Sequence, residues 1–189
     1  MPISTTLDSK LPVIRLTCEI DMPVAFALLD EMKLLHDYYQ FREIELQIDS
    51  PGGSSDALHH LLQSLEPWRS GNGRTLLTVG LNEIASAAAL LLSFGTVGHR
   101  SVSAHSRLLY HAIRKVEREG VSQTVAQMRV ATRRLGQWDD CFMDMLVRHI
   151  EKDKNKQPAA RKKLRQLFRK ERWITAEEAL ALGLIDSIG

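Results

Sequence analysis

Three short apolar strands, each followed by a helix, occupy the first half of this 189-residue chain and restrict its fold more than any other feature. Residues 13–20 and 43–49 alternate apolar and polar side chains, as half-buried strands do. Residues 76–79 are apolar or small throughout, which is typical of a buried strand. Strands that alternate with helices predict right-handed βαβ crossovers and a largely parallel sheet. We therefore expect an α/β fold.

The second half of the chain is dominated by helical patterns. After short strands over residues 97–104 and 108–111, a long helical pattern runs over 122–152 and a basic helix over 158–170. A capping box at Thr175 opens a last short helix. The long helix carries apolar side chains that need a partner surface: Val125, Met128, Leu135, Trp138, Phe142, Met145 and Ile150.

The composition is that of a soluble globular protein, with 44% hydrophobic and 25% charged residues. A net charge of +2 gives no strong attraction to nucleic acid, and the basic helix has interleaved apolar residues that favour a solvated basic face over a nucleic-acid site. The longest uncharged apolar run, residues 84–95, is too short to cross a bilayer, and residues 1–10 lack the pattern of a signal peptide. Cys18 and Cys141 match no metal or redox spacing. We expect a cytoplasmic protein without a metal, membrane or nucleic-acid partner.

Ser86 stands where the third strand has ended and its apolar helix begins. The unpaired N–H groups and the positive dipole end of a helix start stabilise developing negative charge, which suits a nucleophile. A serine at this position also commonly caps the helix. The position alone leaves both roles open.

Two further features have chemical potential. Residues 50–53, Ser-Pro-Gly-Gly, follow the second strand at its carboxyl end, where α/β sheets place ligand sites. The N–H groups of such a turn could serve as an oxyanion hole, or the glycines could simply allow a tight turn. His111 ends a short apolar strand and could be the base for a serine hydroxyl or a structural histidine. His59 and His60 lie on a helix without metal-ligand partners.

Four motifs occur together in one order: the Ser-Pro-Gly-Gly turn, the Ala-Ser junction before the apolar helix, the segment 106–111, and residues 173–186 with the run Trp-Ile-Thr-Ala-Glu-Glu-Ala. In this order they resemble the proteolytic subunit of the Clp protease, in the Clp-protease/crotonase fold, over roughly residues 12–188. The resemblance implies one peptidase domain over residues 1–189. Its head would cover approximately 12–120 and 171–189, and a projecting handle approximately 121–170.

The resemblance also implies the roles of individual residues. Ser86 would be the nucleophile and His111 the base, and Glu171 stands where the family has its catalytic aspartate. The N–H groups of Gly53 and Ala87 would form the oxyanion hole. The implied activity is that of a serine-type endopeptidase that needs no cofactor and hydrolyses peptides or unfolded proteins. The implied assembly is a homo-oligomer of stacked, heptameric rings, with an AAA+ ATPase as a partner.

Several departures from the family pattern bear on these roles. Glu171 replaces an aspartate, and Asp186 and Asp49 are weaker candidates for the acid. The turn over residues 80–85 is longer than in the family, and residues 112–119, which pair with substrate there, are charged and lack glycine. The first expected strand begins only at Val13, so the N-terminal segment that meets the ATPase is expected to be largely missing.

The sequence therefore predicts a serine peptidase with two rivals. A crotonase-like acyl-CoA enzyme would use two backbone N–H groups in the same fold, but it needs no serine–histidine pair. A ring-forming scaffold whose site has drifted is favoured by Glu171 and by the charged segment 112–119.

Overall fold

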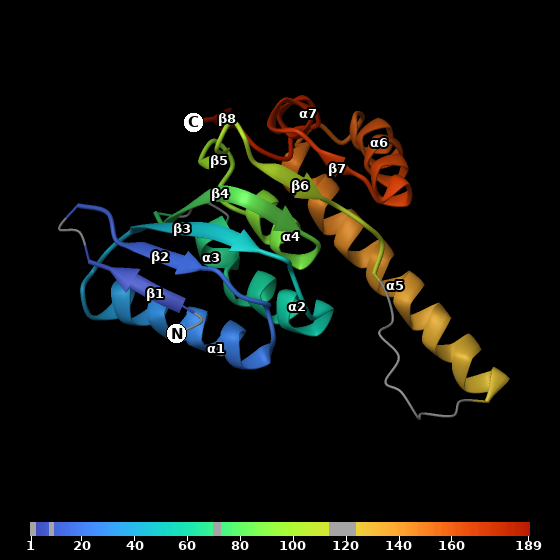
Figure 1. The fold of residues 1–189 in the computed structure, drawn as a ribbon, viewed down its shortest axis with the longest axis horizontal. Coiled ribbons are helices and arrows are strands. Elements are labelled where there is room, and N and C mark those ends of the chain that lie inside the picture. The colour runs from blue at the N-terminus through green and yellow to red at the C-terminus, as the bar shows by residue number, and fades with distance from the viewer. Residues whose placement is uncertain (1–2, 8–9, 70–72, 114–123) are drawn as a thin grey trace. The chain divides into compact units, whose positions relative to one another are not determined.

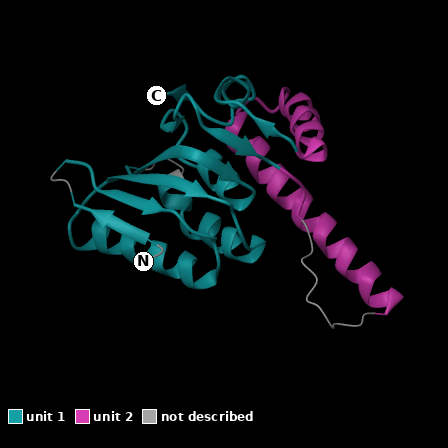
Figure 2. Ribbon diagram, viewed as in Figure 1, with its two compact units in different colours: residues 1–110, 172–189 teal, residues 111–171 magenta. Residues whose placement is uncertain are grey.

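A computed structural model describes residues 3–7, 10–69, 73–113 and 124–189 of the chain. The chain divides into two units, residues 1–110 with 172–189 and residues 111–171, coloured separately in Figure 2. The first unit contains the sheet and the second contains two helices.

The described residues of the first unit form an eight-stranded, mostly parallel sheet with the order β1-β2-β3-β4-β5-β8 (Figure 1). Its main strands are β2 (Val13–Leu16), β3 (Glu43–Ser50), β4 (Thr75–Ala85) and β5 (Arg100–Val102), all parallel to their neighbours in this series. β6 (Arg107–Leu109) pairs with the end of β4, and the short strands β7 (Trp173–Ile174) and β8 (Ser187–Ile188) complete the sheet. The predicted α/β fold with a largely parallel sheet is confirmed.

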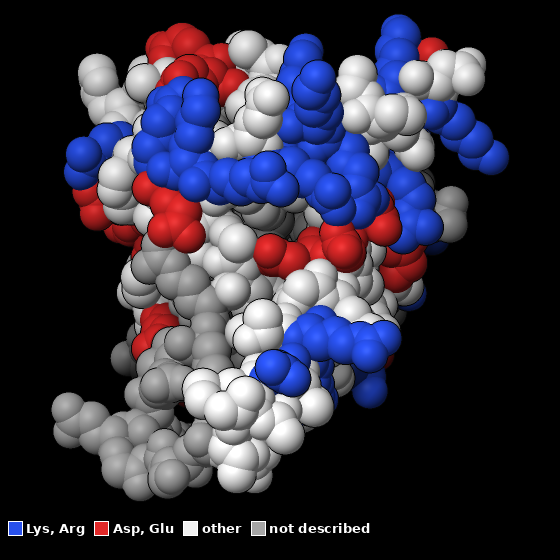
Figure 3. Space-filling view, turned by 90° about the vertical axis from the view of Figure 1, so that its right-hand side faces the viewer, with Lys and Arg blue, Asp and Glu red and all other residues white. Residues whose placement is uncertain are grey.

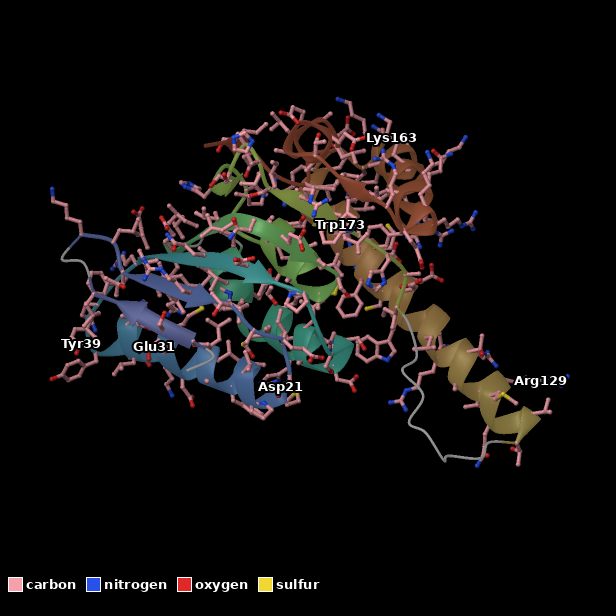
Figure 4. The ribbon with its side chains drawn as sticks, in the orientation of Figure 1. Asp21, Glu31, Tyr39, Arg129, Lys163 and Trp173 are labelled. Carbon is pink, nitrogen blue, oxygen red and sulfur yellow. The ribbon has the colours of Figure 1, made fainter. Side chains whose placement is uncertain are left out.

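The helices α1 (Met22–Asp37), α2 (Ser55–Ser64) and α4 (Ala87–Ser93) lie on one face of this sheet (Figure 1). The alternation in β3 places Ile44, Leu46 and Ile48 in the core, where they are fully buried. All seven residues of α4 are buried, which explains why six of them are apolar. Asp21, labelled in Figure 4, caps α1 by accepting a hydrogen bond from the N–H of Val24 at 2.8 Å. The short helix α3 (Glu66–Arg69) follows α2, and α7 (Ala176–Ala181) begins at the predicted capping box.

Two sequence-based expectations about the strands were wrong. A strand precedes Val13, because β1 (Ile3–Thr6) pairs antiparallel with β2. Residues 80–85 are not a loop but the second part of β4, and residues 83–85 of it pair with β6. The register between β3 and β4 shifts there, since Ile48 lies opposite Gly80 but Ser50 lies opposite Ile84. The residues that looked like a long turn are thus a bulged strand that leads directly to Ser86.

The second unit contains α5 (Val125–Ile150) and α6 (Gln157–Lys170). α5 has 26 residues and begins at a capping box between Thr124 and Gln127. The two halves of α5 differ, because Val125, Met128 and Val130 are exposed whereas Phe142, Met143, Leu146 and Val147 are buried. No helix in the described part of the chain has both the length and the apolar character that a bilayer crossing requires.

The basic helix is amphipathic, as the sequence predicted. Its apolar residues Leu164, Leu167 and Phe168 are buried. Two of its arginines form ion pairs with α5: Arg161 with Asp140 and Asp144, and Arg165 with Asp140. Figure 3 shows the face that lies on the right in Figure 1, where many Lys and Arg side chains (blue) lie next to a group of Asp and Glu side chains (red).

Candidate active site

Ser86 occupies a sharp turn between β4 and α4. Its backbone has φ 57° and ψ −124°, a region that residues other than glycine rarely adopt. The N–H of Ser86 donates to the carbonyl of Leu109 in β6 at 2.8 Å, which fixes the turn against the neighbouring strand. Such a backbone conformation costs about 1–3 kcal/mol and persists where the surroundings enforce it, often at functional sites.

The hydroxyl of Ser86 does not cap the helix. Within the described part of the chain, it accepts no hydrogen bond from the first N–H groups of α4. Ala87 is the first residue of this helix, so its N–H has no acceptor within the helix. Of the two roles that the sequence left open for Ser86, the helix cap is therefore wrong.

Gly52 brings the Ser-Pro-Gly-Gly turn into direct contact with Ser86. A Cβ atom at Gly52 would lie 2.6 Å from Cβ of Ser86, 2.9 Å from N of Ala87 and 2.5 Å from the carbonyl oxygen of Ala85. Real Cβ atoms essentially never make contacts this short, and φ at Gly52 is +98°. The glycine is therefore required by the close approach of two turns, not only by the bend of its own turn.

Gly53 is held by a backbone bridge to Ile20. The N–H of Ile20 donates to the carbonyl of Gly52 at 2.7 Å, and the N–H of Ser54 donates to the carbonyl of Ile20 at 2.8 Å. In a parallel bridge these flanking groups make the bonds, so the N–H of Gly53 points away from Ile20. The first unit thus brings together Gly53, Ser86 and Ala87.

The bulge in β4 is held by Asp49 at the end of β3. Its carboxylate accepts from the side-chain amide of Asn82 at 2.7 Å and from the N–H of Glu83 at 3.5 Å. Asn82 has φ 55°, which asparagine tolerates better than most residues. Asp49, a weaker candidate for the catalytic acid, therefore has a structural task.

Asp186, the other weaker candidate, is engaged by the buried Arg100. Its carboxylate accepts from Nε of Arg100 at 2.8 Å, from Nη2 at 2.6 Å and from the N–H of Gly98 at 2.8 Å. Burial alone raises the pKa of Asp186, but the hydrogen bonds and charge of Arg100 outweigh it and hold the pKa below its ordinary value. This carboxylate fastens the C-terminal segment to the start of β5.

His111 directly follows a firmly anchored residue. Tyr110 is buried, and its hydroxyl lies 2.7 Å from that of Ser93 in α4. His111 itself begins the second unit, and its Nδ1 lies 2.6 Å from the carbonyl oxygen of Ala112. A carbonyl can only accept, so Nδ1 carries the hydrogen and the neutral ring has its lone pair on Nε2. That is the tautomer of a general base that acts through Nε2.

Glu171 also belongs to the second unit and ends α6 in a left-handed conformation, with φ 46° and ψ 43°. Of the charged segment 112–119 that was expected to differ from the family, residues 114–119 lie outside the described residues, as does Gly120. Sequence reasoning missed a residue beside His111. Asp139 of α5 accepts a hydrogen bond from the N–H of Ile113 at 2.8 Å. No sequence motif marks it, because only the fold of the second unit brings it near His111.

The described residues contain no cluster of side chains that could bind a metal ion. Among residues 3–7, 10–69, 73–113 and 124–189, no three His, Cys, Asp or Glu side chains come together in a way that could hold a metal ion.

The family model and the similar proteins found by comparison all refer to the Clp protease. The family model described as Clp protease matches residues 4–189. The "ATP-dependent Clp protease proteolytic subunit 4" of Rhodococcus jostii is 31% identical over 176 residues, which cover 93% of this chain and 83% of the relative. The protein of the same name from Streptomyces avermitilis is 31% identical over 179 residues, with 93% and 72% covered. The "ATP-dependent Clp protease proteolytic subunit 2" of Streptomyces coelicolor is 30% identical, with 93% and 74% covered.

Proposed function

The chain belongs to the Clp protease family, and from this premise we propose that it is a serine-type endopeptidase with Ser86 as the nucleophile. Membership implies a peptidase, and the geometry around Ser86 supports the serine chemistry. The substrates are peptides or unfolded proteins.

The catalytic cycle is an acyl transfer. His111 takes the hydroxyl proton of Ser86 at Nε2, and the serine oxygen attacks the peptide carbonyl. The N–H groups of Gly53 and Ala87 stabilise the oxyanion, His111 protonates the leaving amine, and water then hydrolyses the acyl-enzyme. Glu171 stands at the sequence position of the family's acid and stabilises the imidazolium. Loss of one oxyanion donor typically costs about 10²–10³ in rate, so the placement of both N–H groups is critical.

The single observation that carries the proposal is the backbone of Ser86. A serine held at φ 57° between a strand and a helix, whose hydroxyl makes no capping bond in the described part of the chain, has no structural reason to be there. The same strand–turn–helix placement exposes the nucleophile in other serine hydrolases. The close approach of Gly52 to Ser86 and Ala87 supports backbone N–H groups next to the nucleophile as the oxyanion donors.

We propose further that the protein works as a cytoplasmic homo-oligomer, in stacked and heptameric rings. The exposed apolar residues of the first half of α5, which include Val125 and Val130, support a contact with a second copy. The relatives are named as ATP-dependent, which supports an AAA+ ATPase as a partner that delivers substrate.

Hydrolysis of an unstructured protein and of short fluorogenic peptides tests the activity. The wild type should cleave them, and Ser86→Ala should abolish cleavage while the protein keeps its fold and assembly. Cleavage by Ser86→Ala would contradict the assignment. A correctly assembled but inactive wild type would favour the drifted scaffold. The glutamate at position 171 and the modest identity to the relatives are the observations that favour this alternative. Hydrolysis of acyl-CoA thioesters in place of peptides would favour the crotonase-like enzyme.

A further inference from the structure

Two hydrogen bonds beside His111 meet on one peptide group. Nδ1 of His111 donates to the carbonyl oxygen of Ala112, at 2.6 Å. The N–H of Ile113 donates to Oδ1 of Asp139, at 2.8 Å. The carbonyl of Ala112 and the N–H of Ile113 are the two ends of the same amide. A planar, conjugated amide therefore lies between the carboxylate of Asp139 and the imidazole of His111.

We propose that Asp139 is a positioning residue for His111 and acts through the peptide group that joins Ala112 to Ile113. This inference rests on the proposed function, because it describes how the base of that reaction is oriented. Asp139 touches no reacting atom. It holds the acceptor to which His111 donates, and it thereby fixes the orientation and the tautomer of the ring.

The relay strengthens the bond to Nδ1. An ionised acceptor on the N–H of an amide polarises that amide, and its carbonyl oxygen becomes a better acceptor. When His111 takes the proton of Ser86, the Nδ1–H group becomes more acidic and its bond to the Ala112 carbonyl becomes stronger. The charge of Asp139 therefore stabilises the imidazolium more than the neutral imidazole, which lowers the barrier of the chemical step.

The electrostatic surroundings of Asp139 agree with this coupling. Burial is the largest cause and holds the pKa of the Asp139 carboxyl above its ordinary value, and the neighbouring Asp140 adds to the rise. The hydrogen bond from Ile113 and the charges of His111 and Arg165 act in the opposite direction and favour the ionised carboxylate. The charge of His111 is thus one of the charges that act on Asp139.

Helix α5 holds Asp139 in place. Asp139 is half-buried and is followed one turn later by the buried Phe142 and Met143, so it lies at the edge of the buried side of the helix. Asp140, the next residue, is exposed and pairs with Arg161 and Arg165 of α6. Two adjacent carboxylates thus have different partners, and one of them serves as a natural control for the other.

The test compares Asp139→Asn with Asp140→Asn in the full-length, assembled protein. Both variants lose one negative charge at adjacent positions of the same helix. Asparagine at 139 keeps an oxygen that can accept from Ile113, so the loop stays anchored while the charge is lost. We expect Asp139→Asn to lower kcat roughly tenfold or more with KM within about twofold, whereas Asp140→Asn stays close to the wild type. Asp139→Glu keeps the charge and should retain more kcat than Asp139→Asn.

Two readouts separate positioning from a merely structural effect. The labelling rate of Ser86 by a fluorophosphonate, measured at equal oligomeric mass, should fall together with kcat in Asp139→Asn. If Asp139→Asn matches Asp140→Asn in kcat and labelling, or loses activity only as far as assembly is lost, the relay is wrong. An active wild type with an unaffected Asp139→Asn overturns the relay alone. A wild type that is neither active nor labelled overturns the proposed function and the relay with it. Glu171→Gln, measured in parallel, shows whether the carboxylate at the family's position also contributes.

Discussion

Ser86 has a strained backbone, and its hydroxyl does not cap the helix that follows. Neighbouring residues hold this strained conformation. The hydrogen bond to Leu109 and the close contact with Gly52 hold a conformation that an isolated serine would avoid. If the strain exists for the sake of the nucleophile, removal of the side chain should recover stability at the expense of activity.

This balance predicts a difference between two inactive variants. Glycine adopts a positive φ without a steric penalty, whereas alanine does not. Ser86→Gly should therefore be more stable than Ser86→Ala by about 1 kcal/mol, although neither variant cleaves peptides. Chemical denaturation of both variants measures the difference. Equal stability of the two would show that the turn at position 86 is not strained.

At the scale of elements, the approach of the Ser-Pro-Gly-Gly turn to the start of α4 builds the candidate oxyanion hole. Gly52→Ala should disturb this contact, because the new Cβ would lie 2.6 Å from Cβ of Ser86. Gly98→Ala is the matched control, since Gly98 has φ +91° but nothing lies within 4 Å of its added Cβ. Both variants carry the cost of a positive φ, about 1 kcal/mol, and only Gly52→Ala adds a clash.

Peptide cleavage and thermal unfolding separate the two glycines. Gly52→Ala should lose most of its activity and more stability than Gly98→Ala, which should remain active. A fully active Gly52→Ala would mean that the turn next to Ser86 has no part in catalysis.

The link between the C-terminal segment and β5 depends on pH. The pKa of Asp186 is held below its ordinary value of 3.8 by Arg100, so the pair stabilises the fold above that pH and ceases to do so as the pH falls through the lowered pKa. Asp186→Asn leaves the buried guanidinium without its charge partner and should cost about 3 kcal/mol at pH 7. The difference from the wild type should shrink as the pH falls below 3.8, which denaturation at pH 7 and pH 3 measures. A difference that does not change with pH would contradict this role.

Several elements could be predicted from the sequence because local patterns determine them. The alternation in β3, the mostly apolar sequence of α4 and the capping box of α7 were each recognisable within about ten residues. Residues 80–85 were mistaken for a loop, because the strand is interrupted by a bulge that is stabilised by distant residues, among them Asp49, more than 30 residues away. β1 was missed because its four residues Ile-Ser-Thr-Thr show no distinct periodicity.

The candidate site, too, could be predicted where local patterns mark it and not where contacts between distant segments form it. Ser86, His111 and the two glycines could be proposed from their positions at the ends of strands and from the family pattern. The contact of Gly52 with Ser86 and the bond of Asp139 to Ile113 could not, since each joins segments more than 20 residues apart. The roles of Ser86, His111, Glu171, Gly53 and Ala87 stay predictions.

At the scale of the whole molecule, the first half of α5 exposes apolar side chains that need a partner surface. This helix is about 39 Å long at 1.5 Å per residue. Val125, Met128 and Val130 are 62%, 43% and 68% exposed in the single chain. Phe142 was expected among the residues that need a partner surface, but it is 2% exposed and stacks on Trp138 within its own chain. A contact with a second copy should therefore depend on the beginning of α5.

We predict that the protein forms an oligomer and that charged residues introduced at the beginning of α5 dissociate it. Light scattering coupled to size-exclusion chromatography should give a mass far above the 21.4 kDa of one chain. The double variant Val125→Glu and Val130→Glu should lower this mass while circular dichroism stays unchanged, because exposed positions tolerate a charge in the monomer. A wild-type mass near that of one chain at micromolar concentration would contradict the assembly.

The central claim is that Ser86 is an activated nucleophile, and covalent labelling tests it most directly. A fluorophosphonate reacts with a serine oxygen that an adjacent base activates, and fluoride leaves as the new bond to phosphorus forms. Incubation of the assembled wild type with this reagent, followed by peptide mass spectrometry, should locate one adduct on Ser86. His111→Ala should prevent the reaction. An unmodified Ser86 in the assembled wild type, or equal labelling after His111→Ala, would contradict the account.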